Sequence, residues 1–393
     1  MTRQALIAGG GIGGLATALA IARAGWDVRL YERAPVFGEV GAGVQLGPNV
    51  VKVLQGWGLG DALARVAAFP EWLQVRSAVT GQTLGRLRLG NVIAQRYGAP
   101  YATVHRADLH GLLLNAVRQT GVQLKLNHTL SRFTQNPQLV TAQSDDDPPV
   151  EADVLVGADG LWSPVRQWLL ADGSPRATGH IAYRALVRQA DLPEALRSSQ
   201  VTVWLGSNLH LVQYPVRGGD WLNVVGIVQG HPPGELDNWD QDTDGAGLRA
   251  ALAGACTPLQ DLVQAIPAWR LWVLCDRPPM QGAWQHALGR VALLGDAAHP
   301  MRPYLAQGAG MAIEDAAELG RVLAQALDPA FDVPTMLNRY ALNRWQRNAR
   351  VQARAIRNGQ IFHASGVVRW GRDVSMKLLG ERLLDVPWLY GGP

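Results

Sequence analysis

A glycine-rich run near the start of the chain constrains its fold more than any other feature. Residues 9–14 read Gly-Gly-Gly-Ile-Gly-Gly, directly after a short apolar strand and directly before a predicted helix. Gly9, Gly11 and Gly14 fit the GxGxxG spacing, which permits a tight turn, a close approach to a pyrophosphate and close helix packing. The helix N-terminus then faces the phosphate charge. Residues 5–32 therefore predict a strand–turn–helix–strand unit that binds a dinucleotide, the alternative being a purely structural glycine turn.

An acidic residue follows this unit where the motif requires one. Glu32 ends the next predicted strand, within the reach of about 20 residues that this motif usually shows. Its carboxylate can accept hydrogen bonds from ribose hydroxyls. The acid and the flanking elements together favour dinucleotide binding over a structural turn.

Two further Asp-containing motifs follow later apolar strands. Asp159 lies in Gly-Ala-Asp-Gly after the strand predicted at 153–156, and Asp296 lies in Gly-Asp-Ala-Ala-His-Pro after the strand predicted at 291–295. The second motif leads through Gly308-Ala309-Gly310 into a predicted helix. An Asp-Gly or Gly-Asp pair alone predicts only a turn. Here each pair follows an apolar strand, and open α/β sheets bind ligands at the carboxyl ends of their strands.

The length and the pattern of apolar residues predict more than one domain. A chain of 393 residues is too long for one compact core. Short alternating strands between about 179 and 284, and a hairpin at 72–89, indicate an antiparallel sheet, while 231–247 reads as a surface loop. We predict an α/β fold with three parts: a Rossmann-like dinucleotide-binding domain (1–71, 100–178, 285–335), an inserted, mainly antiparallel β-sheet substrate domain (72–99, 179–284) and a C-terminal helical segment (336–393).

The composition narrows the classes of function. The net charge is +4 and the basic residues are spread singly, so we expect no nucleic-acid partner. Cys256 and Cys275 have no metal-ligand spacing, so neither a metal site nor a disulfide framework is expected. No apolar run reaches the ~20 residues that span a bilayer, and no secretory signal is apparent. We expect a cytoplasmic protein, monomeric or homodimeric.

The three motifs together resemble those of the single-component FAD-dependent aromatic hydroxylases, the para-hydroxybenzoate hydroxylase family, over nearly the whole chain. Three stretches bring the chain nearer to the salicylate, 3-hydroxybenzoate and 6-hydroxynicotinate monooxygenase branch. They are GAGVQLGPN at 41–49, HRADL at 105–109 and YLAQGA at 304–309.

This resemblance implies FAD as the cofactor and gives roles to particular residues. Glu32 is expected at the adenosine ribose, and Arg106 at the FAD phosphates or the flavin edge. Asp159 is expected at the pyrophosphate and in NAD(P)H docking, and Asp296 at the ribityl or ribose side. The backbone of 308–310 is expected to donate to the flavin ring, where a helix N-terminus favours negative charge. The other predicted cofactor-binding residues are Ile12, Gly13, Arg33, Gln45 and Leu130.

The resemblance also implies the reaction. Hydride passes from NAD(P)H to FAD, O2 adds to give a flavin hydroperoxide, and its distal oxygen attacks an electron-rich ring. Because only one GxGxxG is present, the nicotinamide cofactor is expected to dock transiently. The branch points weakly to NADH. The substrate implied is a small phenolic or hydroxylated aromatic acid, whose ring is far more reactive as a phenolate.

His210 and Tyr214 are the candidate catalytic residues. They share one face of the alternating strand at 209–214 with Val212. A base is useful there because a phenol has a pKa near ~10. The alternative is a solvated strand face or a histidine satisfied by a neighbour. Further candidate substrate contacts are Trp204 on the preceding strand, Arg184 and Arg302 for a carboxylate, and Pro303.

Other activities on the same scaffold stay open at this point. An oxidase or an epoxidase would carry the same FAD motifs, and so would a flavoprotein that senses a ligand without turnover. The Trp-x-Trp-x-Ile-Pro signature of halogenases is absent from the sequence. The sequence alone names neither the substrate nor the ring position attacked.

Overall fold

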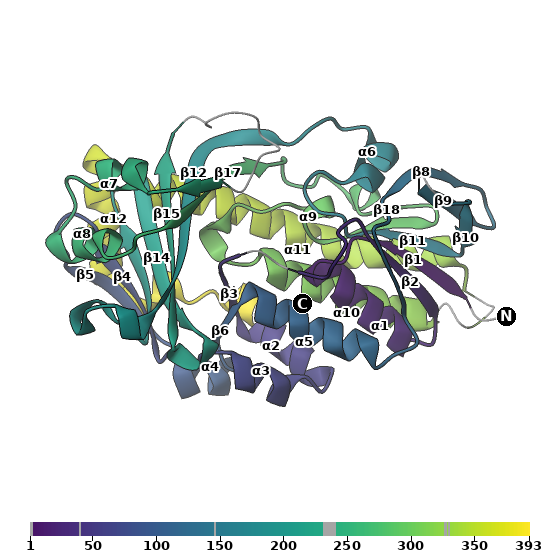
Figure 1. Ribbon diagram of the computed structural model, residues 1–393, viewed down its shortest axis with the longest axis horizontal. Helices are drawn as coiled ribbons and strands as arrows, with labels where there is room; N and C mark the ends of the chain where they lie inside the picture. The colour runs from purple at the N-terminus through teal and green to yellow at the C-terminus, as the bar shows by residue number, and fades with distance from the viewer. Residues whose placement is uncertain (1–2, 39–40, 145–146, 231–240, 326–327, 329–330) are drawn as a thin grey trace. The chain divides into compact units, whose positions relative to one another are not determined.

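The computed structural model describes residues 3–38, 41–144, 147–230, 241–325, 328 and 331–393 (Figure 1). The chain divides into two compact units. Unit 1 comprises Met1–Val40, Ala107–Pro175 and Asp276–Ala355, and unit 2 comprises Gly41–Arg106, Arg176–Cys275 and Ile356–Pro393.

Unit 1 is built on a six-stranded sheet in the order β18-β19-β11-β1-β2-β7. The pairs β1–β2, β1–β11, β2–β7 and β11–β19 are parallel, and β18–β19 is antiparallel. Helix α1 (Ile12–Arg23) packs against α10 (Gly308–Gln325) beside this sheet (Figure 1). The predicted strand–turn–helix–strand unit is therefore confirmed. The strands of this sheet are β1 (Gln4–Ala8), β2 (Asp27–Glu32), β7 (Gln123–Leu126), β11 (Val154–Gly157), β18 (Ala287–Leu288) and β19 (Val291–Leu293).

The central strands of unit 1 are apolar throughout because both of their faces are covered. Every residue of β11 and β19 is buried, and β1 is buried from Ala5 to Ala8. A second sheet, β10-β9-β8, adds to the same core. The remaining elements of unit 1 are β8 (Leu130–Gln135), β9 (Val140–Ser144), β10 (Val150–Ala152), α5 (Arg106–Arg118), α6 (Pro164–Leu170), η4 (Ala283–Gln285), α9 (Gly295–Ala298) and η5 (Pro303–Leu305), and α11 (Val333–Phe362) begins there and ends in unit 2.

Unit 2 is built on an eight-stranded sheet in the order β16-β17-β12-β15-β14-β13-β4-β5. The pairs β12–β15, β14–β15 and β13–β14 are antiparallel, while β13 and β4 run parallel. The predicted antiparallel sheet and the hairpin at 72–89 are confirmed. The strands are β4 (Trp72–Ser77), β5 (Thr83–Arg88), β12 (Arg176–Arg188), β13 (Val201–Leu205), β14 (Leu209–Val216), β15 (Trp221–Gln229), β16 (Gln241–Thr243) and β17 (Trp269–Asp276).

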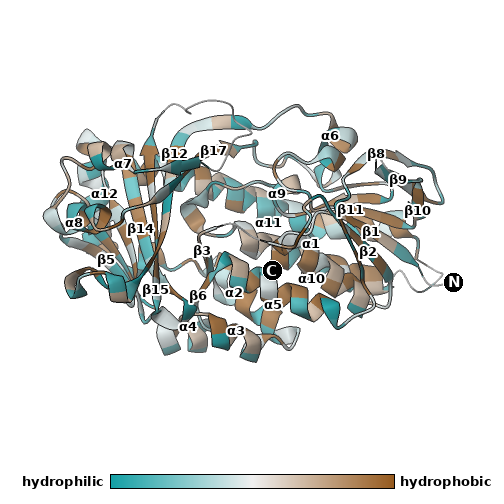
Figure 2. Ribbon diagram, viewed as in Figure 1, coloured by the Kyte–Doolittle hydropathy of each residue, from teal (hydrophilic) through white to brown (hydrophobic). Residues whose placement is uncertain are grey.

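The two faces of the unit 2 sheet carry different residues because side chains alternate along each strand. Leu209 and Leu211 point to a core that includes Leu248 of α7 and Leu259 of α8. Figure 2 shows hydrophobic residues along β14 and β15. The other elements of unit 2 are β3 (Gly43–Leu46), β6 (Ala102–His105), α2 (Pro48–Gly56), α3 (Gly60–Val66), α4 (Gly90–Tyr97), η1 (Gln189–Asp191), η2 (Glu194–Leu196), η3 (Arg217–Gly219), α7 (Ala246–Ala251), α8 (Thr257–Gln264), α12 (Gly366–Leu379), α13 (Glu381–Leu384) and α14 (Pro387–Tyr390).

The bounds of the units differ from the predicted domains. Residues 276–284 group with unit 1, and 356–393 group with unit 2 and do not form a separate part. Residues 41–71 and 100–106 group with the sheet of unit 2, because β3 pairs with β6 and β6 contacts β14. Residues 336–355 group with unit 1, where Arg344 and Asn348 of α11 bond Asp315 of α10. The predicted surface loop is wrong after residue 240, since 241–243 form β16. Its first part, 231–240, lies outside the described residues.

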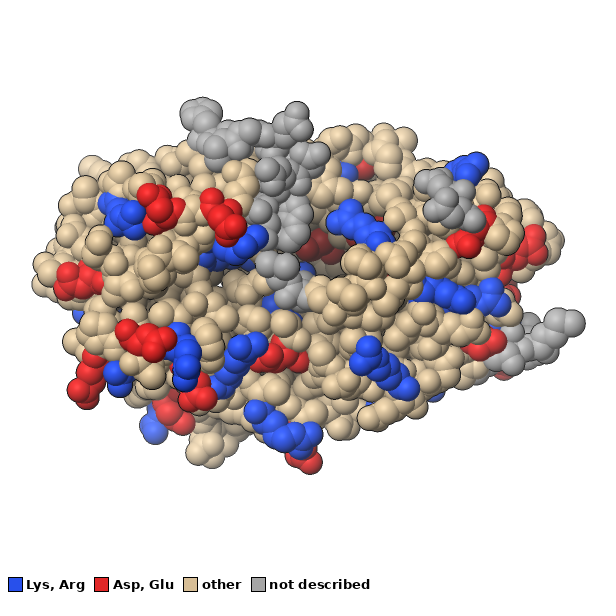
Figure 3. Space-filling model, in the orientation of Figure 1, with Lys and Arg blue, Asp and Glu red and all other residues tan. Residues whose placement is uncertain are grey.

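Charged side chains of both signs are interspersed on the face shown in Figure 3. This agrees with the spread of basic residues in the sequence and with a net charge of only +4. Among the described residues, no helix combines the length and the apolar character that crossing a membrane requires.

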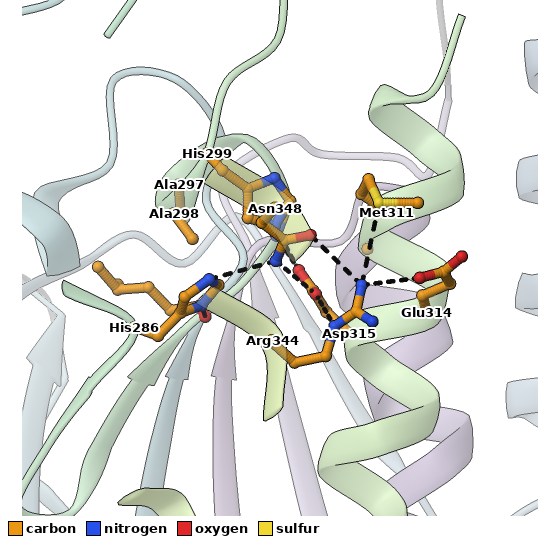
Figure 4. Close-up of polar contacts among 12 residues, drawn as sticks. His286, Ala297, Ala298, His299, Met311, Glu314, Asp315, Arg344 and Asn348 are labelled. Carbon is orange, nitrogen blue, oxygen red and sulfur yellow. Dashed lines mark hydrogen bonds and ion pairs between the residues drawn. The ribbon is translucent and has the colours of Figure 1, made fainter. Parts of the chain in front are cut away.

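A buried network of charges joins α9, α10 and α11 within unit 1 (Figure 4). The Asp315 carboxylate accepts from Arg344 Nε at 2.7 Å and from Asn348 Nδ2 at 2.9 Å, and it contacts His299 Nε2. Arg344 also lies 2.9 Å from the Glu314 carboxylate. Burial alone would raise the pKa of Asp315, but the charges of His299 and Arg344 outweigh burial and hold it below its usual value.

We expect Arg344→Met to destabilise the protein by about 3–5 kcal/mol, because removal of one partner leaves buried carboxylates without compensation. Urea denaturation at pH 7 measures the effect. Since the pKa of Asp315 is lowered, its contribution is present at neutral pH and is lost as the pH falls below about 4.

The matched control is Arg321→Met. Arg321 pairs with Glu318 on an exposed helix surface, its side chain being 49% exposed. Loss of such a pair changes stability by about 0–1 kcal/mol. Equal losses in the two variants would contradict a structural role for the buried network.

Candidate functional site

The glycine turn of unit 1 is shaped by close backbone contacts. Gly9 has φ +102°, and a Cβ there would lie 2.4 Å from the Ala158 carbonyl oxygen. A Cβ on Gly14 would lie 1.8 Å from the Gly9 carbonyl oxygen. Gly11 is the N-cap residue of α1 and has no side chain that could accept from the first-turn N–H groups. This end of α1 can therefore accept a phosphate, as the sequence predicts.

Glu32 closes the same turn. One carboxylate oxygen accepts from the Gly10 N–H at 2.7 Å, and the other accepts from the Ala34 N–H at 2.8 Å. Both oxygens are thereby oriented at the carboxyl end of β2, and each retains lone pairs for ribose hydroxyls. The adjacent Arg33 lies close enough to Asp159 to favour the ionised form of that carboxyl.

Asp159 is a buried acid at the carboxyl end of β11. Burial raises its pKa to about 6, against the hydrogen bonds from Ser163 and from the Val165 N–H. Its Oδ1 is buried and makes no hydrogen bond to the protein. A buried acceptor without a donor is costly, and a ligand hydroxyl or N–H would remove that cost.

Asp296 and the start of α10 come together in unit 1. Asp296 is the one exposed residue of the segment 291–300, and the other residues of this segment are buried. A Cβ on Gly308 would lie 4.0 Å from the Asp296 Oδ1. The carboxylate therefore lies beside the helix N-terminus that begins at 308–310, where backbone N–H groups point outward.

The remaining predicted cofactor residues of unit 1 have packing roles. Ile12 is buried at the start of α1, and a Cβ on Gly13 would lie 3.0 Å from Leu294. The side chain of Leu130 belongs to the core around β8, so any contact of this residue with adenosine would come from its backbone.

Arg106 and Gln45 lie in unit 2. The Arg106 side chain contacts Gly41, where a Cβ would lie 3.2 Å from its Cδ. Gln45 Oε1 accepts from the Tyr101 hydroxyl at 2.6 Å. Gln45 also lies beside Tyr214, whose ionised form it favours, although burial raises the pKa of Tyr214 overall.

The register of the unit 2 sheet places the predicted catalytic residues on one face. Tyr214 pairs with Asn223, Val212 with Val225, and His210 with Ile227. Successive members are two residues apart on each strand, so all of these side chains point to the same face of the sheet. Val225 in turn pairs with Arg184 on β12. The face shared by His210 and Tyr214 therefore also carries Arg184 and Asn223.

This face has a partly exposed patch, which we call the open patch and define as Arg184, Val212 and Val225. Val212 is the one residue of β14 that is not buried. Val225 and Arg184 are its neighbours on β15 and β12, and both are likewise partly exposed between buried residues. Buried His210 and Tyr214 flank Val212 along β14, so the open patch has a polar group at each end.

Two polar residues near the open patch were missed by sequence reasoning. Asn223 is fully buried, its Oδ1 accepts from the Gly43 N–H at 2.6 Å, and its Nδ2 makes no hydrogen bond to the protein. His363 Nε2 lies 2.8 Å from His210 Nδ1. The alternation of β15 could have indicated Asn223, but His363 is 153 residues from His210 and no local pattern links them.

The prediction that Trp204 lies with His210 is wrong. Trp204 pairs with Leu211, so it lies on the opposite face of the sheet. Its indole Nε1 donates to Gln213 at 3.1 Å, and its ring packs in the core with Leu209. The sequence places Trp204 on a neighbouring strand but gives no register, which decides the face.

Arg302 is already held by a carboxylate of the protein. Its Nε donates to the Asp276 Oδ2 at 2.7 Å, and Asp276 is buried. Pro303 follows at the first position of the short helix η5. Arg184 in unit 2 is instead stacked on an aromatic ring, with its guanidinium carbon 3.3 Å from the centroid of Trp272.

Residues 2–355 match the family described as FAD binding domain. The chain is 39% identical over 391 residues to the 3-hydroxybenzoate 6-hydroxylase of Polaromonas naphthalenivorans, covering 98% of this chain and 95% of that protein. It is 38% identical over 349 residues to the 6-hydroxynicotinate 3-monooxygenase of Bordetella bronchiseptica, covering 88% of each.

Solved structures also match nearly the whole chain. A salicylate hydroxylase substrate complex matches with a TM-score of 0.84 and 28% identity, covering 99% of this chain and 95% of that one. Klebsiella pneumoniae HpxO complexed with FAD and uric acid matches with a TM-score of 0.84 and 27% identity, covering 97% and 94%.

We expect Glu32→Gln to weaken FAD binding by about tenfold or more, because hydrogen bonds to a charged group are worth about 1.5–3 kcal/mol each. The measurement is quenching of flavin fluorescence as FAD is added back to the apoprotein. Glu318→Gln, at a partly buried position of α10 where the carboxylate pairs with Arg321, serves as control. Unchanged FAD affinity in Glu32→Gln would contradict the ribose role.

Proposed function

This chain belongs to the family described as FAD binding domain, and from that membership we propose that it is an FAD-dependent aromatic monooxygenase. Its substrate is a small aromatic acid with a ring hydroxyl, and it uses NAD(P)H and O2. The relatives named above are a hydroxylase and a monooxygenase, and their sequences match 98% and 88% of this chain. The single observation that carries the substrate class is the open patch, in which Arg184 lies beside two valines and which His210 flanks along β14.

The residues of unit 1 fit FAD. The glycine turn and the uncapped start of α1 suit a pyrophosphate, and Glu32 and Asp296 suit ribose or ribityl hydroxyls. The start of α10 suits the pyrimidine edge of the flavin. When bound, FAD supplies the hydride acceptor and the site at which O2 is activated.

The open patch suits a flat aromatic ring. Val212 packs in part against the core that contains Val203 and Met376, and together with Val225 it offers a partly exposed apolar surface. The neighbouring residues of both strands are buried, which limits access of water. Strands rise about 3.3 Å per residue, so the Cα atoms of His210 and Tyr214 lie roughly 13 Å apart. A single ring above Val212 can then lie between the two side chains.

Arg184 supports an acidic substrate. Its stacking on Trp272 engages the face of the guanidinium, whereas a carboxylate binds in the guanidinium plane. Stacking also fixes the direction in which that plane points. We therefore assign the substrate carboxylate to Arg184, in preference to Arg302, which is held by Asp276.

His210 supports activation of the ring hydroxyl. Burial is the main cause that lowers its pKa well below the usual value, and His363 and His180 add to the effect. The imidazole is therefore neutral at pH 7 and able to accept a proton. Its Nδ1 lies 2.8 Å from His363 Nε2, and we assign the role of proton acceptor to the His210 imidazole.

The test is to supply the FAD-loaded protein with NADH or NADPH, O2 and 3-hydroxybenzoate, salicylate or 6-hydroxynicotinate. Oxidation of NAD(P)H should be slow alone and faster with the matching acid, and the product should gain one oxygen atom by mass. His210→Asn should slow hydroxylation by about 10²–10⁴-fold, the usual worth of a general base, and should raise H2O2 while FAD content stays unchanged.

Benzoate is the control ligand, because it keeps the carboxylate and lacks the hydroxyl. A site that hydrogen-bonds a substrate hydroxyl rejects such an analogue by about 10⁴–10⁵-fold. Fast NAD(P)H oxidation without any ligand, and no hydroxylated product from the acids, would contradict the proposal and favour an oxidase. Wild-type hydroxylation by His210→Asn would remove the base assignment alone.

A further inference from the structure

A cavity lies on the face of the unit 2 sheet opposite the open patch. Its volume is about 260 Å³, and its wall includes parts of β4, β13 and β14. The register places Gln74, Thr202 and Gln213 side by side in one row across these strands, and Arg76 and Trp204 in the next row. We call it the Trp204 cavity and define it by Gln74, Arg76, Arg197, Trp204, Gln213 and Leu262.

The polar row of the Trp204 cavity contains a side-chain donor that the described residues leave unpaired. Most of this sheet face is apolar and packs against α7 and α8. Gln74 Nε2 donates to Thr202 Oγ1 at 3.0 Å, whereas Gln213, which is 7% exposed, accepts at Oε1 from Trp204 Nε1 at 3.1 Å. Because an indole N–H only donates, this bond fixes the amide of Gln213 and leaves its Nε2 on the other side. None of the described residues accepts from that Nε2, although buried polar groups are normally hydrogen-bonded.

Trp204 also holds a guanidinium at the same cavity. The Arg76 Cζ lies 4.4 Å from the centroid of the Trp204 ring. Arg76 Nε and Nη2 both donate to the Gly81 carbonyl, at 3.0 and 2.8 Å, so the guanidinium is fixed. Its Nη1 has no acceptor in the part of the chain that the structure describes. Trp204 therefore anchors two donors, Arg76 through its ring face and Gln213 through its indole nitrogen.

The lining of the Trp204 cavity favours an anion. It contains Arg76 and Arg197 and no acidic residue among its described members. A larger cavity of unit 1, about 850 Å³ in volume, has two arginines but also four acidic residues in its lining. Leu196, Pro258 and Leu262 give the Trp204 cavity an apolar wall beside its charged groups. A ligand that matches both kinds of wall carries a carboxylate and a hydrocarbon part.

We propose that the Trp204 cavity is a second ligand site, which binds a monocyclic organic acid with its carboxylate between Arg76 Nη1 and Gln213 Nε2. A hydrogen bond from a charged donor to a carboxylate is about twice as strong as a neutral one. Both donors are already held by Trp204, so little freedom is lost when the ligand binds. The cavity is smaller than the roughly 300–1,000 Å³ of pockets for drug-sized ligands, which suits a single ring. Gln213 alternates with Val212 and Tyr214 along β14, so this ligand contacts the strand of the open patch from its other face.

The probe for this site is 4-bromobenzoate, because it has one ring, a carboxylate and a bromine atom whose anomalous scattering locates it in a crystal. Crystals of the FAD-loaded protein are soaked with the probe, and isothermal titration calorimetry measures its affinity in solution. We expect a bromine peak inside the Trp204 cavity, with the carboxylate at Arg76 and Gln213. In solution, one class of binding should persist in Arg184→Met, because Arg184 belongs to the open patch.

Arg76→Met should weaken this class of binding by about tenfold or more, because it removes the charged donor but keeps a side chain that packs on Trp204. Arg88→Met is the matched control. Arg88 also lies over a tryptophan of this sheet, with its Cζ 5.9 Å from the centroid of the Trp72 ring, but it is exposed and lies outside the cavity lining. Gln213→Glu keeps the acceptor for Trp204 and replaces the donor with an oxygen that repels a carboxylate, so it should also weaken binding by about tenfold or more.

A bromine peak in the cavity, with weaker binding in Arg76→Met and wild-type binding in Arg88→Met, supports the second site. No peak there at saturating probe, or wild-type affinity in Arg76→Met, overturns it. A peak without binding in solution marks binding at crystal concentration only and also overturns it. Should Arg76→Met fail to fold, Gln213→Glu decides, and wild-type affinity in that variant overturns the site. A failure to hydroxylate any of the acids leaves these results unchanged, because the proposed function depends on the open patch and not on the Trp204 cavity.

Discussion

The Asp315 carboxylate is the interaction on which the order of unit 1 depends. It is fully buried and collects Arg344, Asn348, His299 and the Gly295 N–H. These donors come from α11, from α9 and from the residue that follows α9, whereas Asp315 itself belongs to α10 (Figure 4). Asp296 lies in α9, and the glycines that we propose to face the flavin begin α10, so one buried charge fixes both parts of the proposed cofactor site. The cost of burying that charge is offset because several donors share it.

The register of β12, β14 and β15 has the corresponding role in unit 2. A shift of one residue would move His210 and Tyr214 to the face that packs against α7 and α8, and would bring Leu211 to the open patch. The core on that opposite face, with Leu209, Leu211 and Trp204, opposes such a shift because buried leucines would become partly exposed. The apolar face therefore holds the polar face in place, and substitutions on either side are expected to be coupled.

Most of unit 1 could be predicted from the sequence because its signals are local. The glycine turn, its strand and helix, and the two Asp motifs lie within short segments, so spacing alone locates them. The face shared by His210 and Tyr214 follows from alternation in one strand. Trp204 was misplaced, and the pairing of His363 with His210 was not foreseen, because both depend on register and on contacts between distant segments. The grouping of 41–71 with the sheet likewise depends on the β3–β6 pair, which joins residues far apart in sequence.

Burial sets the chemistry of the sheet face more strongly than the identity of any one residue does. An exposed histidine titrates near ~6.5 and would be partly charged at neutral pH, whereas His210 is neutral because its charge is not solvated. The same burial raises the pKa of Tyr214, which keeps its hydroxyl protonated and able to donate. Arg184 then carries the positive charge beside the two valines of the open patch. Under the proposed function, an anionic ring acid would be attracted to that arginine, and the two neutral groups would contact its hydroxyl. The open patch can therefore separate recognition of the carboxylate from activation of the ring.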